Sequence, residues 1–329
     1  PQSIKKLPCR LNPVVLMFIV LCAAGIPATG LSLTWLAEEL ITRMARNSFL
    51  VLSLLIPVSA GMGLNFSIVL GAMAAQAAII AVIHWHIDGV GGLLVAAILS
   101  TPLAIVLGYL VGQLFNKAKG REMITGMIAG FFANGIYQLV FLFGVGTVIP
   151  MKDEKLMLPG GIGMRSVLDL KGLRMVLDNL VSVRIADVKI PIMTFVVVAL
   201  LAWGITKLMR TKLGQDFRAV GQDMSVAAVS GINVNRTRII AIILSTVLAA
   251  WGQLIFIQNI GTLNVFNSHE QVGTFAIASL LVGGASASRA TIGQALLGTL
   301  LFHTLFVVSP RAGQSLLGSA QIGEYFRVF

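Results

Sequence analysis

Long apolar stretches alternate with short polar segments along almost the whole chain. A helix needs about 20 consecutive apolar residues to cross a bilayer, and most of these stretches reach that length. The strands of a transmembrane barrel would instead alternate in segments of about 10 residues, which these continuous runs do not do. We therefore predict an all-α polytopic membrane bundle with about nine spans, at residues 13–33, 49–67, 70–87, 91–114, 123–148, 190–208, 237–258, 271–285 and 291–309.

The composition agrees with a membrane protein. Of the 329 residues, 57% are hydrophobic and 11% are charged, whereas soluble domains contain about 25% charged residues. The mean hydropathy is +0.90. The two cysteines, Cys9 and Cys22, show no Cys-x-x-Cys or metal-ligand spacing, so the sequence predicts neither a disulfide framework nor a zinc site. We interpret both as small apolar residues.

The distribution of basic residues predicts the orientation in the membrane. Lys5, Lys6 and Arg10 precede the first span, which favours a cytoplasmic N-terminus. With that start, the cytoplasmic side carries 13 basic residues, and the opposite side carries four outside the long segment 149–189. That segment counts less because long loops translocate regardless of charge. We therefore predict that 149–189 is an external loop and that the net charge of +11 reflects topology rather than nucleic-acid binding.

Three further predictions concern the first span, the segment that follows it and the C-terminus. The first span also resembles a secretory signal peptide, with its basic flank and small residues, although it is long for one. The next segment, Leu33–Asn47, is amphipathic, and Glu39 and Arg43 have the spacing of a helical ion pair. We predict that this helix lies flat on the external surface. Nine spans would leave the C-terminus outside, so we expect a tenth span after Phe329.

The sequence contains no G-x-x-x-x-G-K-[ST], G-x-S-x-G or H-E-x-x-H motif, which argues against an enzyme. His84 and Asp88 are four residues apart and would share a helix face. They are either a metal or proton-relay site or, beside Trp85, ordinary interfacial anchors. His303 in the last span is either a packing residue or a functional ionisable group.

Ionisable side chains are nearly absent from the other predicted spans. An ion-coupled secondary transporter usually buries several of them. The pattern therefore favours a transporter with an outside energy source, with an ion-coupled carrier or channel as the alternative.

The most polar cytoplasmic stretch is Thr211–Ala241. Its glycines bracket a short helical piece whose small residues would let it fit closely into a partner's groove. Arg218, Arg236 and Arg238 would pair with acidic groups of that partner or with lipid head groups. A solvated basic loop that follows the positive-inside rule is the alternative.

Three stretches resemble the permeases of bacterial ABC importers, in the ribose-type subfamily that serves simple sugars, nucleosides and branched-chain amino acids. They are TKLGQDFRAVGQD from Thr211, GMGLNFSIVLGAMAA from Gly61, and ASLLVGGASASRATIGQALLGTLL from Ala278. The resemblance implies one permease domain over 1–329, with a cytoplasmic coupling segment at 210–236.

In that family the coupling segment inserts a short helix into a cleft of a separate ATPase subunit. The residues that the resemblance assigns to coupling are Gly214, Arg218, Ala219, Gly221, Ala227, Ala228 and Gly231.

The other two stretches are rich in glycine, and the first contains Asn65. Irregular backbone at membrane depth is tolerated where it is buried in protein or lines a water-filled cavity. Asn65 would then bind solute or satisfy freed backbone groups, whereas close helix packing is the alternative role for the glycines. Helix breaks at corresponding positions in the two halves of a transporter indicate where its translocation path lies. The predicted path residues are Gly61, Gly63, Asn65, Gly71, Gly283 and Gly284.

The resemblance also implies the partners and the location. We expect a second permease subunit, identical or paralogous, two ABC ATPase subunits that hold ATP and Mg²⁺, and an extracytoplasmic solute-binding protein. The chain itself would need no cofactor and would lie in the bacterial inner membrane, in contact with lipid. The solute would be a simple sugar or a nucleoside-like nutrient. Loop 149–189 is longer than the equivalent loop that we expect in a sugar permease, which counts against the sugar assignment.

Overall fold

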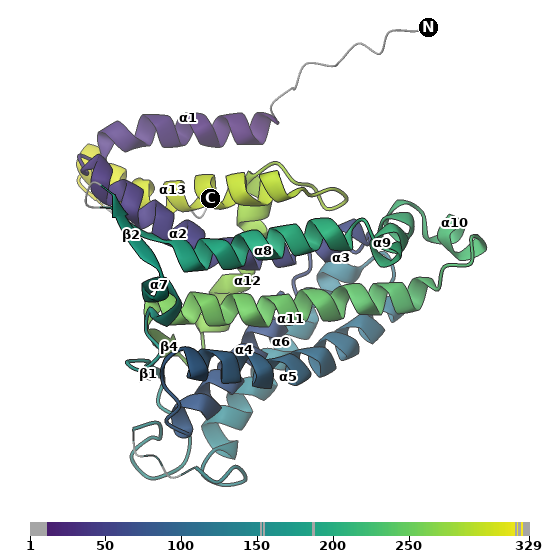
Figure 1. Cartoon of the computed structure of the whole chain (residues 1–329), viewed down its shortest axis with the longest axis horizontal. Coiled ribbons are helices and arrows are strands. Elements are labelled where there is room, and N and C mark those ends of the chain that lie inside the picture. Colours follow the sequence, from purple (N-terminus) through teal and green to yellow (C-terminus); the bar gives the residue numbers. More distant parts are fainter. Residues whose placement is uncertain are drawn as a thin grey trace, which may run out of the picture.

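A computed structural model describes residues 12–151, 153, 155–185, 188–319, 321 and 324. The predictions that concern Lys5, Lys6, Cys9, Arg10 and the segment after Phe329 lie outside these residues. Helices form most of the described chain (Figure 1). In chain order they are α1 (Pro13–Ala28), α2 (Leu33–Ser53), α3 (Leu55–Ser59), α4 (Ile68–His84), α5 (Gly89–Lys117), α6 (Glu122–Leu139), the π-helical turn η1 (Val140–Gly144), α7 (Val176–Leu180), α8 (Ile192–Leu208), α9 (Lys212–Gln222), α10 (Met224–Val229), α11 (Val234–Ile260), α12 (Ser268–Val282) and α13 (Ile292–Leu317).

The all-α membrane bundle is confirmed. Within the described residues, five helices are long and apolar enough to cross a membrane, and a sixth counts if α8 and α9, bent by 75°, form one span. The five are Leu33–Ser59, Gly89–Lys117, Glu122–Gly144, Val234–Ile260 and Ile292–Leu316. α1 and α4 are apolar but shorter, and α12 has 15 residues. The count of nine spans therefore stays a prediction.

The expectation of a separate surface helix at Leu33–Asn47 is wrong. α2 continues without a break from Leu33 to Ser53, and Ala45 and Asn47 are buried. Its charged side chains are half-buried and have partners within the protein, because Arg43 pairs with Glu39 at 2.5 Å and Arg46 donates a hydrogen bond to Asn259 Oδ1 at 3.1 Å. Charged residues in this stretch therefore do not mark a helix that lies on the surface.

The predicted span 49–67 is also wrong at its C-terminal end. The helical pair α2–α3 ends at Ser59, and residues 60–67 form a turn before α4 begins at Ile68. Gly61 and Gly63 have φ values of +72° and +70°, which residues with a side chain rarely adopt. The glycines therefore end one helix and reverse the chain into the next.

α11 lies at the centre of the bundle, with α4 and α5 packed along it. Small residues allow close approach between these helices. A Cβ atom at Gly108 or Gly112 of α5 would lie 3.0 Å from the Cα of Ile243 or Ile239. The stripe of glycines on α5 therefore brings two long helices into backbone contact.

Two short antiparallel sheets close one end of the bundle. The strands are β1 (Val167–Asp169), which pairs with β4 (Thr262–Asn264), and β2 (Ser182–Ile185), which pairs with β3 (Val188–Pro191). α7 and these strands lie at the left of Figure 1, whereas α9 and α10 lie at the right. The predicted external segment and the predicted coupling segment therefore lie at opposite ends of the bundle.

Candidate functional site

The predicted coupling segment folds into two short helices. Thr211 caps α9 by accepting a hydrogen bond from the N–H of Gly214 at 3.4 Å, and Asp223 caps α10 by accepting from Ser225 and Val226 at 2.7 and 3.0 Å. Val229, at the end of α10, is 91% exposed. The segment thus presents a protruding helical tip with an uncovered apolar residue.

Several residues that the sequence assigned to coupling hold this segment against the bundle. A Cβ at Gly214 would lie 2.3 Å from the carbonyl oxygen of Leu208, and the Arg218 guanidinium donates to the carbonyl of Met209 at 2.7 Å. Ala227 is buried, whereas Ala228 is exposed. Ala219 packs against a small cluster that contains Ala227, and Gly231 reverses the chain with φ of +82°.

A buried ion pair lies beneath the coupling segment, at the base of α11. Arg238, 1% exposed, donates to Glu122 Oε1 at 2.5 Å and to the carbonyl oxygen of Phe115 at 3.2 Å. Its other terminal nitrogen lies 3.0 Å from the sulfur of Met224 in α10. The expectation that Arg238 pairs with a partner or with lipid is wrong, because its charge pairs with Glu122 inside the protein.

Asn65 is fully enclosed in the turn between α3 and α4. Its side-chain oxygen accepts hydrogen bonds from the N–H of Ser67 at 3.1 Å and from the Ser67 hydroxyl, and its amide donates to the Ser245 hydroxyl at 3.4 Å. Gly63 packs on Met123, with a Cβ position 3.3 Å from Met123 Cγ. In this conformation the polar groups of Asn65 serve the turn and α11 rather than an open cavity.

The remaining predicted path glycines are at helix contacts. A Cβ at Gly71 would lie 2.4 Å from the carbonyl oxygen of Thr246, and one at Gly283 would lie 1.9 Å from that of Gln294. Gly284 follows with φ of +82°, which ends α12. This geometry is what close packing of small residues in membranes requires.

Sequence reasoning missed a polar cluster between α4, α6 and α12. His269 lies 3.0 Å from Gln76 Oε1 through Nδ1 and 2.8 Å from Asn134 Oδ1 through Nε2. The Tyr137 hydroxyl also donates to Gln76 Oε1, at 3.0 Å, and the Asn134 amide donates to Glu270. The predicted span 271–285 begins just after these two ionisable residues, so a loop was expected there.

A groove of about 350 Å³ opens beside this cluster. Its walls come from the start of α4, the middle of α6 and the first turns of α12. The lining residues are Phe66, Val69, Met127, Gly130, Phe131, Asn134, Glu270, Gly273 and Thr274. The groove joins the polar cluster to the turn that contains Asn65, so it is the candidate site for a solute.

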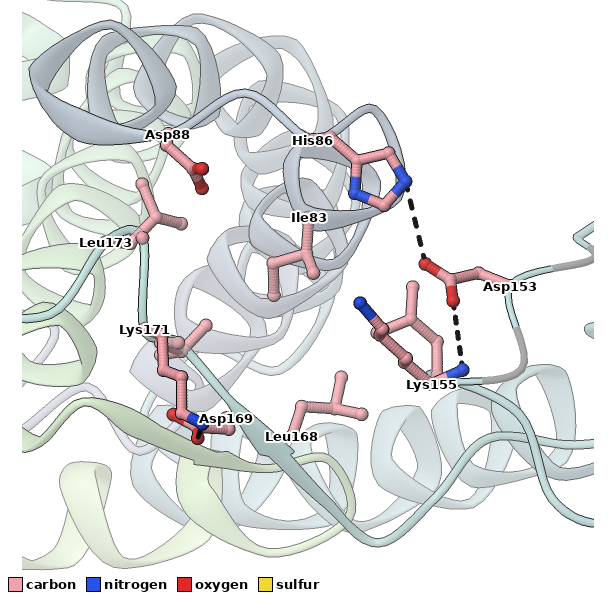
Figure 2. A pocket seen from close by; sticks show the side chains of 12 residues that line it. Ile83, His86, Asp88, Asp153, Lys155, Leu168, Asp169, Lys171 and Leu173 are labelled. Carbon is pink, nitrogen blue, oxygen red and sulfur yellow. Dashed lines mark hydrogen bonds and ion pairs between the residues drawn. The ribbon is translucent and has the colours of Figure 1, made fainter.

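A second pocket, of about 450 Å³, lies among the loops at the opposite end from the coupling segment (Figure 2). His86 Nε2 is 3.9 Å from Asp153 Oδ2, and Lys171 pairs with Asp169 at 3.5 Å. Asp88 lines the same pocket. Both acidic and basic side chains line this pocket.

The prediction that His84 and Asp88 share a helix face is wrong. α4 ends at His84, and Asp88 is the residue before α5 begins. Among the described residues, no group of three His, Cys, Asp or Glu side chains could hold a metal ion. His303 is buried between Phe302 and Phe306, and neither ring nitrogen has a hydrogen-bond partner within the described part of the chain.

Comparison with known proteins identifies the relatives of this chain. The family described as branched-chain amino acid transport system / permease component matches residues 36–329. The autoinducer 2 import system permease protein LsrC of Klebsiella pneumoniae is 39% identical over 108 residues, which are 32% of this chain and 29% of the relative. The nucleoside ABC transporter permease protein NupC of Lactococcus lactis is 27% identical over 220 residues, 63% of this chain and 64% of the relative.

A third relative is the D-allose transport system permease protein AlsC of Escherichia coli, 27% identical over 129 residues, or 39% of each chain. The matched regions thus span between 29% and 64% of the lengths of these three relatives. No solved structure matches. Because the family match covers most of the sequence, the chain belongs to the family of permease components of branched-chain amino acid transport systems.

Proposed function

We propose that this chain is the membrane permease of an ATP-binding-cassette importer and moves a small polar solute inward by alternating access. The family match over residues 36–329 carries this proposal, and the protruding α9–α10 segment supports it. ATP and Mg²⁺ would be held by a separate ATPase subunit. Its binding cleft would cover the exposed tip around Val229 and leave Gly214, Arg218 and Gly221 to transmit force into the bundle.

The membrane topology follows from the same proposal. α1, α4, α8 and α12 would cross or enter the membrane together with the five longer helices, which gives nine spans. The N-terminus and α9–α10 would be cytoplasmic, and the segment 149–189 would be external. The charged pocket around Asp88 and Asp153 would then face a solute-binding protein. A second permease subunit would complete the central path.

The relatives guide the choice of solute. Their names describe permeases for autoinducer 2, nucleosides and D-allose. We therefore propose a simple sugar or nucleoside-like solute for this chain.

The test is purification of the permease from membranes that contain its complete importer. The wild-type protein should bring down an ATPase subunit, and Val229→Asp should lose it because the substitution places a charge in the covered tip. Val148→Asp is the matched control, since Val148 is 83% exposed at the opposite end. If Val229→Asp retains the ATPase, or if the wild type brings down none, the coupling proposal fails.

An ion-coupled carrier is the second candidate, because the buried His269 and the neighbouring Glu270 are ionisable groups at the start of α12. Uptake that collapses with a protonophore while ATP is maintained would favour this carrier. Uptake that collapses only when ATP is depleted would favour the importer.

A further inference from the structure

Glu270 lies at a depth in the membrane where an exposed carboxylate is costly. The Asn134 amide that donates to it is at the middle of the span Glu122–Gly144, and His269 contacts Gln76 at the middle of α4. Yet Glu270 is exposed on the surface of the chain. Ionisable side chains within a bilayer almost always face the protein interior or a water-filled cavity. The surface beside Glu270 is therefore a wet surface rather than a lipid-facing one.

The polar cluster fixes the orientation of Glu270 without satisfying it. Asn134 donates to one carboxylate oxygen, and within the described residues no ion pair neutralises the charge. The position of Glu270 in the first turn of α12 stabilises the negative charge, because backbone N–H groups point toward that end. Behind it, the Nε2 amide of Gln76 is buried and has no hydrogen-bond partner among the residues that the structure describes. The cluster thus holds one hydrogen-bond acceptor toward the groove.

Thr274 provides the complementary group. It lies four residues after Glu270, so the two side chains share one face of α12, and both line the groove. Thr274 is exposed and makes no side-chain hydrogen bond to the described residues. A carboxylate that accepts and a hydroxyl that donates, one helical turn apart, match two hydroxyl groups of one small molecule.

The other walls of the groove are apolar. Phe66 and Phe131 lie among the lining residues, and Phe131 is 71% exposed. An aromatic ring beside polar side chains offers a flat apolar surface to the carbon face of a ring-shaped solute. The volume of about 350 Å³ is at the lower end of the range for small-molecule sites.

From this arrangement we infer that the α4–α6–α12 groove binds the transported solute and that Glu270 and Thr274 select uncharged, polyhydroxylated molecules. This inference rests on the proposed transport function and adds to it the residues and the solute class. Of the predicted path residues, Asn65 lies next to the groove in sequence, because Phe66 lines it.

The first experiment tests whether the groove is wet, and it requires no transport. In the full chain with Cys9→Ser and Cys22→Ala, Thr274→Cys is treated in its native membrane with a membrane-impermeant thiosulfonate, applied to right-side-out and to inside-out vesicles. We expect labelling from at least one side to be at least tenfold faster than that of Val106→Cys, which is exposed on α5 outside the groove. Equal, slow labelling of both variants would overturn the inference even if an ATPase co-purifies.

The second experiment tests the solute class in cells that express the complete importer. The probes are labelled D-ribose, D-allose, uridine and L-leucine. We expect uptake of at least one of the three hydroxylated probes, and Glu270→Gln and Thr274→Val should each lower its initial rate about tenfold at equal protein amount. ATPase co-purification should stay unchanged, which separates this result from a failure of coupling. Uptake of none of the three, or normal uptake in both variants, would overturn the assignment.

Discussion

Gly61 and Gly221 contact each other through their backbones. A Cβ at Gly61 would lie 2.6 Å from the Cα of Gly221, and a Cβ at Gly221 would lie 2.4 Å from the carbonyl oxygen of Ser59. The resemblance assigned one glycine to the translocation path and the other to coupling. In the structure these two glycines touch, so a displacement of α9 would act directly on the turn between α3 and α4.

This contact predicts that Gly221→Ala disturbs both segments. The added methyl group meets backbone atoms, which cannot move aside as a flexible side chain can, and overpacking of this kind costs about 1–3 kcal/mol. We expect a lower midpoint temperature of unfolding in detergent and a loss of solute-stimulated ATPase activity in the assembled importer.

Gly204→Ala in α8 is the matched control, because nothing lies within 4 Å of its Cβ position. It should leave both measurements near the wild-type values. If Gly221→Ala keeps the wild-type unfolding midpoint and the wild-type solute-stimulated ATPase activity, the contact between Gly61 and Gly221 is loose enough to accept a methyl group.

The ion pair between Glu122 and Arg238 leads to a second prediction. Removing one partner of a buried pair leaves an uncompensated charge and costs about 3–5 kcal/mol, whereas replacing both with apolar residues is often neutral. Glu122→Leu should therefore strongly lower stability, and Glu122→Leu combined with Arg238→Met should recover much of the loss. Chemical denaturation in detergent measures the wild type, Glu122→Leu, Arg238→Met and the double variant. A double variant as unstable as the sum of the single variants would contradict the pairing.

Much of the helical architecture was predictable because the length and hydropathy of each apolar run indicate where a helix lies. α8 and α13 begin within two residues of the predicted spans at 190–208 and 291–309, since each apolar run follows a clear polar boundary. The course of α2 was not predictable in this way. Its charged residues suggested a surface helix, and only Asn259, more than 200 residues away in sequence, shows how Arg46 is accommodated inside the protein.

The candidate groove could not be predicted from the sequence for a related reason. The segment containing His269 and Glu270 has the polarity of an ordinary loop before a span. The partners that bring it to the middle of the bundle, Gln76 and Asn134, are 193 and 135 residues distant from His269 in sequence. Such pairings depend on how helices pack, and hydropathy along one chain does not encode them.

Asn65 provides a third prediction, because its hydrogen bonds join the α3–α4 turn to α11. Asn65→Ala removes the acceptor for Ser67 and the donor to Ser245, at about 1 kcal/mol for each bond. Asn65→Ala and Ser245→Ala should be less than additive in a double-mutant cycle, since each removes the same bond to α11. Additive losses of stability would indicate that the two side chains act independently.

The last prediction concerns the end of the bundle that we propose to be external. Asp178 is buried and accepts hydrogen bonds from Gln258 at 3.1 Å, from Asn259 at 2.7 Å and from Thr194. Asp178→Ala would leave these donors unsatisfied, and each costs about 1–3 kcal/mol. We expect the segment between α6 and α8 to detach locally, and limited proteolysis of the purified permease should then cleave it at least tenfold faster. Asp169→Ala is the control in the same segment, because its pair with Lys171 is exposed and such pairs contribute at most about 1 kcal/mol. Equal cleavage rates in the two variants would mean that Asp178 does not hold this segment to α11.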